Sequence, residues 1–128
     1  MARKNHLNYE LLSSHSLSAS FNSPATVIKF TDNVSYQINI TTTNSVGSFS
    51  VQVSNDYAVN PMDPQDITNP GTWDTLTLSG TPTVNSANDV IVISLNQLPY
   101  DAIRLAYTSS VAGTGVCTAY LTSKQIGG

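Results

Sequence analysis

The stretch that decides the fold reads Asp89-Val-Ile-Val-Ile-Ser-Leu-Asn96, then Gln-Leu-Pro-Tyr-Asp101, then Ala-Ile-Arg-Leu-Ala-Tyr-Thr108 and, after a glycine-containing turn, Gly115-Val-Cys-Thr-Ala-Tyr-Leu-Thr-Ser123. Three apolar runs of strand length, rich in valine, isoleucine, tyrosine and threonine, are separated here by turn residues, which predicts a β-meander. The run Val90-Ile-Val-Ile93 is apolar on both faces. It therefore predicts a central strand covered on both sides, with the second cover supplied either by this chain or by another subunit.

The same alternation of apolar and polar residues recurs along the rest of the chain. It predicts strands at residues 14–21, 26–31, 36–41, 48–54 and 74–78, with loops at 55–72 and 79–88. No stretch has the apolar spacing of a helix of ordinary length. Together with the three C-terminal strands this predicts an all-β fold, an antiparallel β-sandwich that is jelly-roll-like and has about eight strands.

The chain of 128 residues is the size of one domain. Residues 1–12 are polar with scattered apolar members, a pattern that fits either an arm or a short strand. We divide the chain into an N-terminal arm at 1–12 and a single β-sandwich domain at 13–128. The candidate assembly residues of the arm are Arg3, Lys4, Leu7 and Tyr9.

Charged residues make up 10% of the chain and the formal net charge is −3. A globular domain carries about 25% charged residues on average, so polarity here comes from serine, threonine and asparagine. Low charge suits a surface that contacts other protein, because charge is depleted from interface cores. The acidic balance argues against nucleic acid as a partner, and no apolar run approaches the roughly 20 residues that span a bilayer.

The residues that carry chemistry are few and dispersed. His6, His15 and Cys117 are too scattered in sequence for a zinc site, which needs three or four such ligands. No serine or cysteine stands in an activating motif, and the alternation predicts a buried structural role for Cys117. We therefore expect no enzymatic activity, no metal and no cofactor.

The stretch 55–72 is the candidate ligand or partner loop, because loops of this length are often functional. Its candidate residues are Tyr57, Asp63, Asp66 and Trp73. The carboxylates of Asp56, Asp63 and Asp66 suit calcium, although ordinary solvated carboxylates are the favoured interpretation. The aromatic rings suit stacking on a sugar, although packing beneath the loop is favoured for Trp73.

Four phrases of the sequence resemble small virion structural proteins of tailed bacteriophages. They are Phe49-Ser-Val-Gln-Val-Ser-Asn-Asp-Tyr57, Gly71-Thr-Trp-Asp-Thr-Leu-Thr-Leu78, Leu95-Asn-Gln-Leu-Pro-Tyr-Asp-Ala-Ile-Arg-Leu-Ala-Tyr107 and Gly113-Thr-Gly-Val-Cys-Thr-Ala-Tyr-Leu-Thr-Ser-Lys124. The resemblance covers roughly residues 15–126. Similar phrases recur in galactose-binding-like and discoidin-like sandwiches, which bind carbohydrate or lipid head groups.

The resemblance implies a non-enzymatic part of the particle, of the capsid decoration or cement type, the head-tail accessory type or the fibre-base type. The implied partners are the chain itself, as a homo-oligomer for which a trimer is one candidate state, and other virion proteins. We expect assembly in the host cytoplasm, a final location in the virion, and an arm that tethers the domain to an acidic shell. The alternative is a carbohydrate-binding β-sandwich module with a glycan bound near Tyr57 and Trp73.

Overall fold

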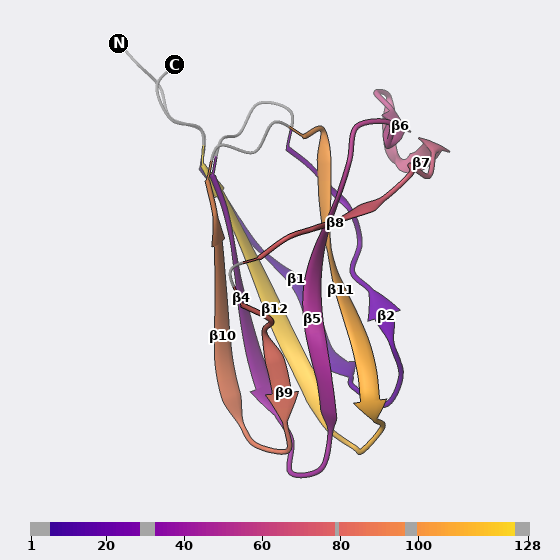
Figure 1. Ribbon diagram of the computed structural model, residues 1–128. Helices are drawn as coiled ribbons and strands as arrows, with labels where there is room; N and C mark the ends of the chain where they lie inside the picture. Colours follow the sequence, from indigo (N-terminus) through magenta and orange to yellow (C-terminus); the bar gives the residue numbers. More distant parts are fainter. Residues whose placement is uncertain (1–5, 29–32, 79, 97–99, 125–128) are drawn as a thin grey trace.

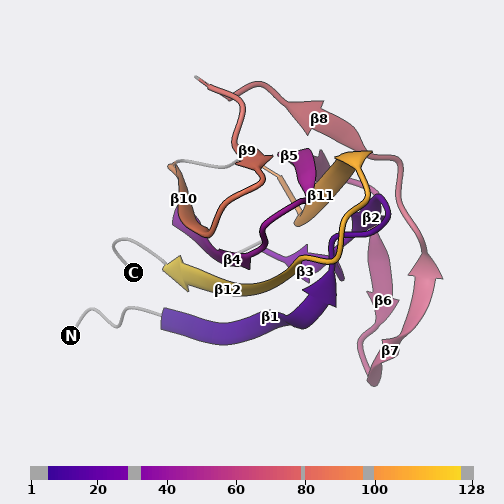
Figure 2. The same ribbon diagram turned by 90° about the horizontal axis from the view of Figure 1, so that it is seen from below.

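The computed structural model describes residues 6–28, 33–78, 80–96 and 100–124. Over these residues the protein is an all-β sandwich of two antiparallel sheets, and the two layers are visible end-on in Figure 2. The first sheet (Figure 1) contains, in spatial order, β1 (His6–Ser16), β12 (Val116–Lys124), β4 (Asn33–Thr41) and β10 (Asp89–Leu95).

The second sheet is built around two long strands, β11 (Ala102–Val111) and β5 (Val46–Ser54). The outer side of β11 pairs with two short strands, β2 (Phe21–Asn22) and β3 (Thr26–Val27). The outer side of β5 pairs likewise with β8 (Asp74–Leu76) and β9 (Thr83–Asn85). Each pair of short strands thus completes one edge of the sheet.

The topology is that of a jelly roll. The order β1-β12-β4-β10 in one sheet faces the order β2/β3-β11-β5-β8/β9 in the other. When the short strands that share an edge are counted as one position, this is the eight-strand, two-sheet arrangement of that fold. The predicted fold class is therefore confirmed.

Side chains at every second position of the long strands fill the space between the sheets, as period-two alternation requires. Residues with no exposed surface include Leu17, Tyr36, Ile38, Val51, Leu105 and Leu121. Their burial removes apolar surface from water at roughly 25 cal/mol per Å², the main favourable contribution to folding. The inward faces predicted for 36–41 and 48–54 are confirmed.

The prediction of a β-meander at the C-terminal end is wrong. All three of its strands form, but consecutive ones lie in different sheets: β10 and β12 both pair with β4, whereas β11 pairs with β5. Two strands joined by a short turn show the same apolar alternation whether they pair as a hairpin or lie in different sheets. Periodicity therefore predicted which face of each strand is buried, and it could not identify the neighbouring strand.

The position of β10 is a second correction. It is an edge strand of the described chain, because β4 pairs with it on one side only. Ile93 is buried in the core, but Val90 and Val92 are 57% and 61% exposed. The chain itself therefore covers one face of this strand.

The N-terminal boundary is a third correction. Residues 6–12 are part of β1, which pairs with β12 from His6 opposite Lys124 onward, and Leu11 and Leu12 are buried. Register shifts between Glu10 and His15 break the simple alternation, which hid the strand in the sequence. Residues 1–5, with two of the candidate arm residues (Arg3 and Lys4), lie outside the described part of the chain.

The other two candidate arm residues lie in this strand. Leu7 pairs through its backbone with Ser123, and the hydroxyl of Tyr9 shares a hydrogen bond of 2.5 Å with Thr26. The strand predicted at 14–21 is also interrupted: β1 ends at Ser16, and β2 begins in the other sheet. This part of the chain therefore carries the first crossing between the layers.

The predicted loop at 55–72 contains a separate hairpin of β6 (Ala58–Asn60) and β7 (Asp63–Asn69), which stands apart from the two sheets in Figures 1 and 2. Its pairing has two register shifts, and Met62 and Ile67 are 91% and 52% exposed. Because neither face of the hairpin packs on the core, its sequence carries no apolar period. The predicted loop at 79–88 likewise contains a strand, β9, whose central residue Val84 is buried in the core.

Candidate functional site

Asp56 closes the base of the loop that carries the β6–β7 hairpin. Its carboxylate accepts hydrogen bonds from the Ser54 hydroxyl and from the N–H of Thr72, both at 2.7 Å. The Thr72 N–H, followed by the Ser54 hydroxyl, holds the pKa of Asp56 below its usual value. Since Ser54 ends β5 and Thr72 precedes β8, this carboxylate fixes both ends of the loop on the second sheet.

The two candidate aromatic residues come together beside this clamp. The rings of Tyr57 and Trp73 have centroids 5.7 Å apart, and the indole N–H of Trp73 donates to the carbonyl of Pro70 at 2.9 Å. The guanidinium carbon of Arg104 lies 4.4 Å from the centroid of the Trp73 ring. Trp73 thus packs under the loop and over β11, the role that the sequence favoured for it.

Arg104 is held on the outer face of the second sheet. Its Nε donates to Oε1 of Gln52, the residue opposite it on β5, at 2.7 Å. Partial burial lowers the pKa of Arg104 from its ordinary value. The planar guanidinium bonds to the amide and stacks on the indole at the same time, a combination that arginine can make and lysine cannot.

The two candidate carboxylates of the loop lie on the hairpin. Asp63 accepts the N–H of Gln65 at 3.2 Å, and Asp66 accepts the side-chain amide of Asn60 at 3.3 Å. Both are exposed, and these contacts are local turn contacts. Within the described ranges, no three His, Cys, Asp or Glu side chains gather where they could hold a metal ion.

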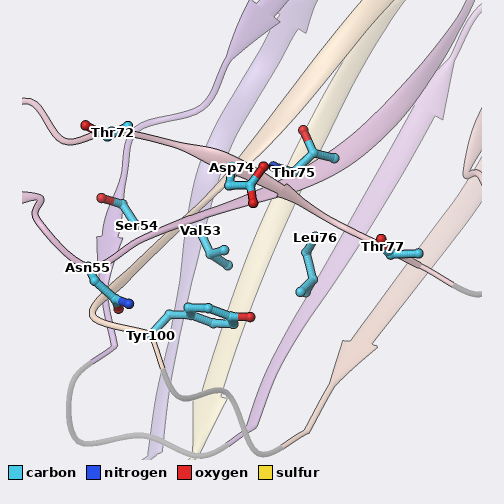
Figure 3. A pocket seen from close by; sticks show the side chains of 9 residues that line it. All are labelled: Val53, Ser54, Asn55, Thr72, Asp74, Thr75, Leu76, Thr77 and Tyr100. Carbon is cyan, nitrogen blue, oxygen red and sulfur yellow. Dashed lines mark hydrogen bonds between the residues drawn. The ribbon is translucent and has the colours of Figure 1, made fainter.

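An open cleft of about 470 Å³ runs along β8 (Figure 3). Figure 3 shows Val53 and Leu76 pointing toward the ring of Tyr100, and these three side chains form the apolar part of the cleft. Asn55, Asp74 and several threonines supply its polar side. The cleft combines amide and hydroxyl groups with one carboxylate, so it is suited to contact with an extended polypeptide or a polyol rather than to acid–base chemistry.

The nucleophile and two phenols of the core are inert. Burial raises the pKa of the Cys117 thiol to about 11, so the reactive thiolate is suppressed. Burial also raises the pKa of Tyr36 and Tyr107, and neither phenolic oxygen has a hydrogen-bond partner in the part of the chain that the structure describes. These groups act in packing.

The surface that sequence analysis missed lies on the outer face of the first sheet. A hollow of about 480 Å³ is bordered by the side chains of Ser35, Gln37, Asn39, Val92, Tyr120 and Thr122. Across β4 and β10 the single charged residue is Asp89, at the start of β10. The alternation inside β10 was the available signal, because Asp89, Ile91, Ile93 and Leu95 share one face and leave Val90 and Val92 on the other.

No protein-family model matches this chain, and no curated protein matches it. Among solved structures, the crystal structure of the SPBc2 prophage-derived protein YomS has a similar fold. The alignment covers 98% of this chain and 97% of that chain, with a TM-score of 0.56 and 7% sequence identity. The likeness shows a shared fold over almost the whole of both chains. None of the described segments forms a helix with the length and apolar character to cross a bilayer.

Proposed function

We propose that this chain is a non-enzymatic structural component of a bacteriophage particle, of the capsid decoration or cement type or the head-tail accessory type, and that it acts through protein–protein contacts. The observation that carries the proposal is the end-to-end similarity in fold to a prophage-derived protein. The phrases of sequence that resemble tailed-phage virion proteins support the same conclusion independently, because they are read from residues and not from the fold.

The surface supports a role in assembly. The hollow on the outer face of the first sheet is bordered by hydroxyl, amide and valine side chains without a charged one, and depletion of charged residues is typical of the core of a protein interface. The β6–β7 hairpin adds an exposed methionine, Met62, and an exposed isoleucine, Ile67, on an element that pairs only with itself among the described strands. Methionine is enriched at interfaces because its flexible side chain adapts to a partner.

No observation favours the carbohydrate-binding alternative over assembly. The ring of Trp73 contacts Arg104 and Tyr57, and its indole N–H is bonded to the backbone. These contacts give Trp73 a structural role in holding the loop. Glycan binding near Tyr57 and Trp73 stays a prediction, and a glycan array probed with the purified full chain would test it.

The proposed function is tested on particles of the phage or induced prophage that encodes the chain. Particles are purified by density gradient, and the amount of this chain relative to the major capsid protein is measured by quantitative mass spectrometry. We expect a fixed ratio that survives repeated gradients. A chain that is abundant in the lysate and absent from the particles would overturn the proposal.

A matched pair of variants makes this test specific to the folded domain. Leu121→Asp places a charge at a position with no exposed surface, and we expect it to be lost from particles because the sandwich does not form. Thr118→Ser retains the hydroxyl of a partly exposed residue on the same strand and should be incorporated normally.

A further inference from the structure

The open edge of β10 is the basis of this inference. β10 pairs with β4 over seven consecutive residues without a register shift, and among the described residues no strand pairs with its other side. Figure 2 shows it at the end of its layer, opposite β1. Natural proteins protect such edges with lysine, proline or a bulge, because an unprotected edge is a template for another strand. Between Val90 and Leu95 there is none of these, and the strand borders an open pocket of about 280 Å³ whose other wall is formed by Thr77, Leu78, Gly80 and Pro82.

The hydrogen bonds identify which backbone groups are free. The N–H of Val90 donates to the carboxylate of Asp89 at 2.8 Å, so this amide points away from β4. In an antiparallel strand, the N–H and C=O of alternate residues point to the same side. Val92 and Ser94 therefore present their N–H and C=O groups at the same open edge.

We propose that β10 pairs in antiparallel register with β10 of a second copy of this chain, about a two-fold axis at Val92. This register pairs the whole of β10 with itself, because Val92 is the central residue of Asp89–Leu95. Val92 then lies opposite Val92 of the other copy, and Val90 lies opposite Ser94. Because each copy uses the same edge, the pairing closes after two copies and makes one continuous sheet.

Charge supports a second copy as the occupant. Asp89 is the single charged residue of β10, and the two-fold register places it opposite Leu95, so no like charges meet. Val92, which is 61% exposed, meets Val92 of the other copy, and such a cross-strand valine pair stabilises a sheet. The inference rests on the proposed function of assembly, for which it names a surface and a partner.

A charge-pair experiment tests the register. The masses of the full chain and its variants are measured by light scattering across a dilution series. The wild type should be a dimer. Val92→Lys should weaken dimerisation by more than about tenfold, because the two lysines would face each other across the axis. Mixing Val92→Lys with Val92→Glu should restore a dimer. Val111→Lys changes a valine of similar exposure (52%) at the end of β11 and should leave the dimer intact.

A wild type that is monomeric at every concentration, or that forms a trimer, would overturn the inference. So would a Val92→Lys variant that dimerises as the wild type does, or a failure of the mixed charges to restore association while both variants remain folded by circular dichroism. A monomer that still copurifies with particles would overturn this pairing and leave the proposed function standing. A dimer that is absent from particles would overturn the proposed function and leave this pairing standing.

Discussion

Replacing Tyr36 by phenylalanine should make this protein more stable. The side chain of Tyr36 has no exposed surface, and its phenolic oxygen has no hydrogen-bond partner among the described residues. The phenol of Tyr9, which contributes to the raised pKa of Tyr36, shares its hydrogen bond with Thr26 instead. The folded state therefore removes this hydroxyl from water without giving it a replacement partner.

The magnitude follows from the opposing contributions of the oxygen. A buried polar group without a partner costs about 1–3 kcal/mol relative to its hydrated state. Removing the oxygen leaves a void smaller than a methyl group, and the lost contacts cancel less than about 1 kcal/mol of that gain. We expect Tyr36→Phe to raise the free energy of unfolding by about 1 kcal/mol, and the Tm by about 4 °C for a chain of this length.

Urea denaturation and thermal unfolding, both followed by circular dichroism, measure this change. Tyr120→Phe is the matched control: it removes the same oxygen from a partly exposed position on the outer face, so the stability should change by less than about 0.5 kcal/mol. A Tyr36→Phe protein less stable than the wild type by 1 kcal/mol or more would refute the reasoning. It would mean that the hydroxyl is satisfied in solution, for example by a buried water molecule.

Three further predictions concern the core and the loop anchor. Gly47→Ala should lower the free energy of unfolding, measured by urea denaturation, by about 1–3 kcal/mol, because an added Cβ collides with the hydroxyl and ring of Tyr107 and with the backbone carbonyl of Thr108. Adding Tyr107→Phe removes the hydroxyl collision and should recover part of the loss, whereas simple additivity of the two changes would contradict this explanation. Arg104→Ala should destabilise the protein by about 1 kcal/mol and shift the emission of Trp73, the single tryptophan, to longer wavelength, and an unchanged spectrum would show that the stacking is absent in solution. Burial raises the pKa of Cys117 from 9.0 to about 11, so the folded protein keeps the thiol proton over a pH range in which the unfolded chain loses it. The stabilisation that the neutral thiol provides is complete below pH 9 and should be lost by about pH 11, which lowers the free energy of unfolding by about 2–3 kcal/mol. Under reducing conditions the Cys117→Ala variant should show a smaller decline in stability over this pH range.

The candidate site shows how far local patterns reach. Tyr57 and Trp73 flank one loop, and their proximity in the folded chain follows from the closure of that loop. The clamp that closes it, Asp56 with Ser54 and Thr72, joins residues 16 positions apart, and no local pattern identifies that contact. The stacking of Arg104 on Trp73 depends on the pairing of β5 with β8 on one side and with β11 on the other, which is a property of the assembled sheet.

The sequence alone determined the class of the fold and the buried face of most strands. Phe49, Val51 and Val53 alternate with polar residues, and period-two alternation is a local consequence of the pleat, so these residues could be assigned to the core without a structure. The same reasoning correctly placed Cys117 in the core.

Only the tertiary structure decided which strands are neighbours. Pairing joins residues far apart in the chain, and its free energy depends on the surfaces that meet, so the alternation of β10 is equally compatible with a central strand and with an edge strand. Among the described strands β10 pairs with β4 alone, so it forms the edge of the sheet, and Val90 and Val92 are exposed. Long-range pairing with β12 likewise makes residues 6–12 part of β1, and Leu11 and Leu12 of this strand belong to the buried core.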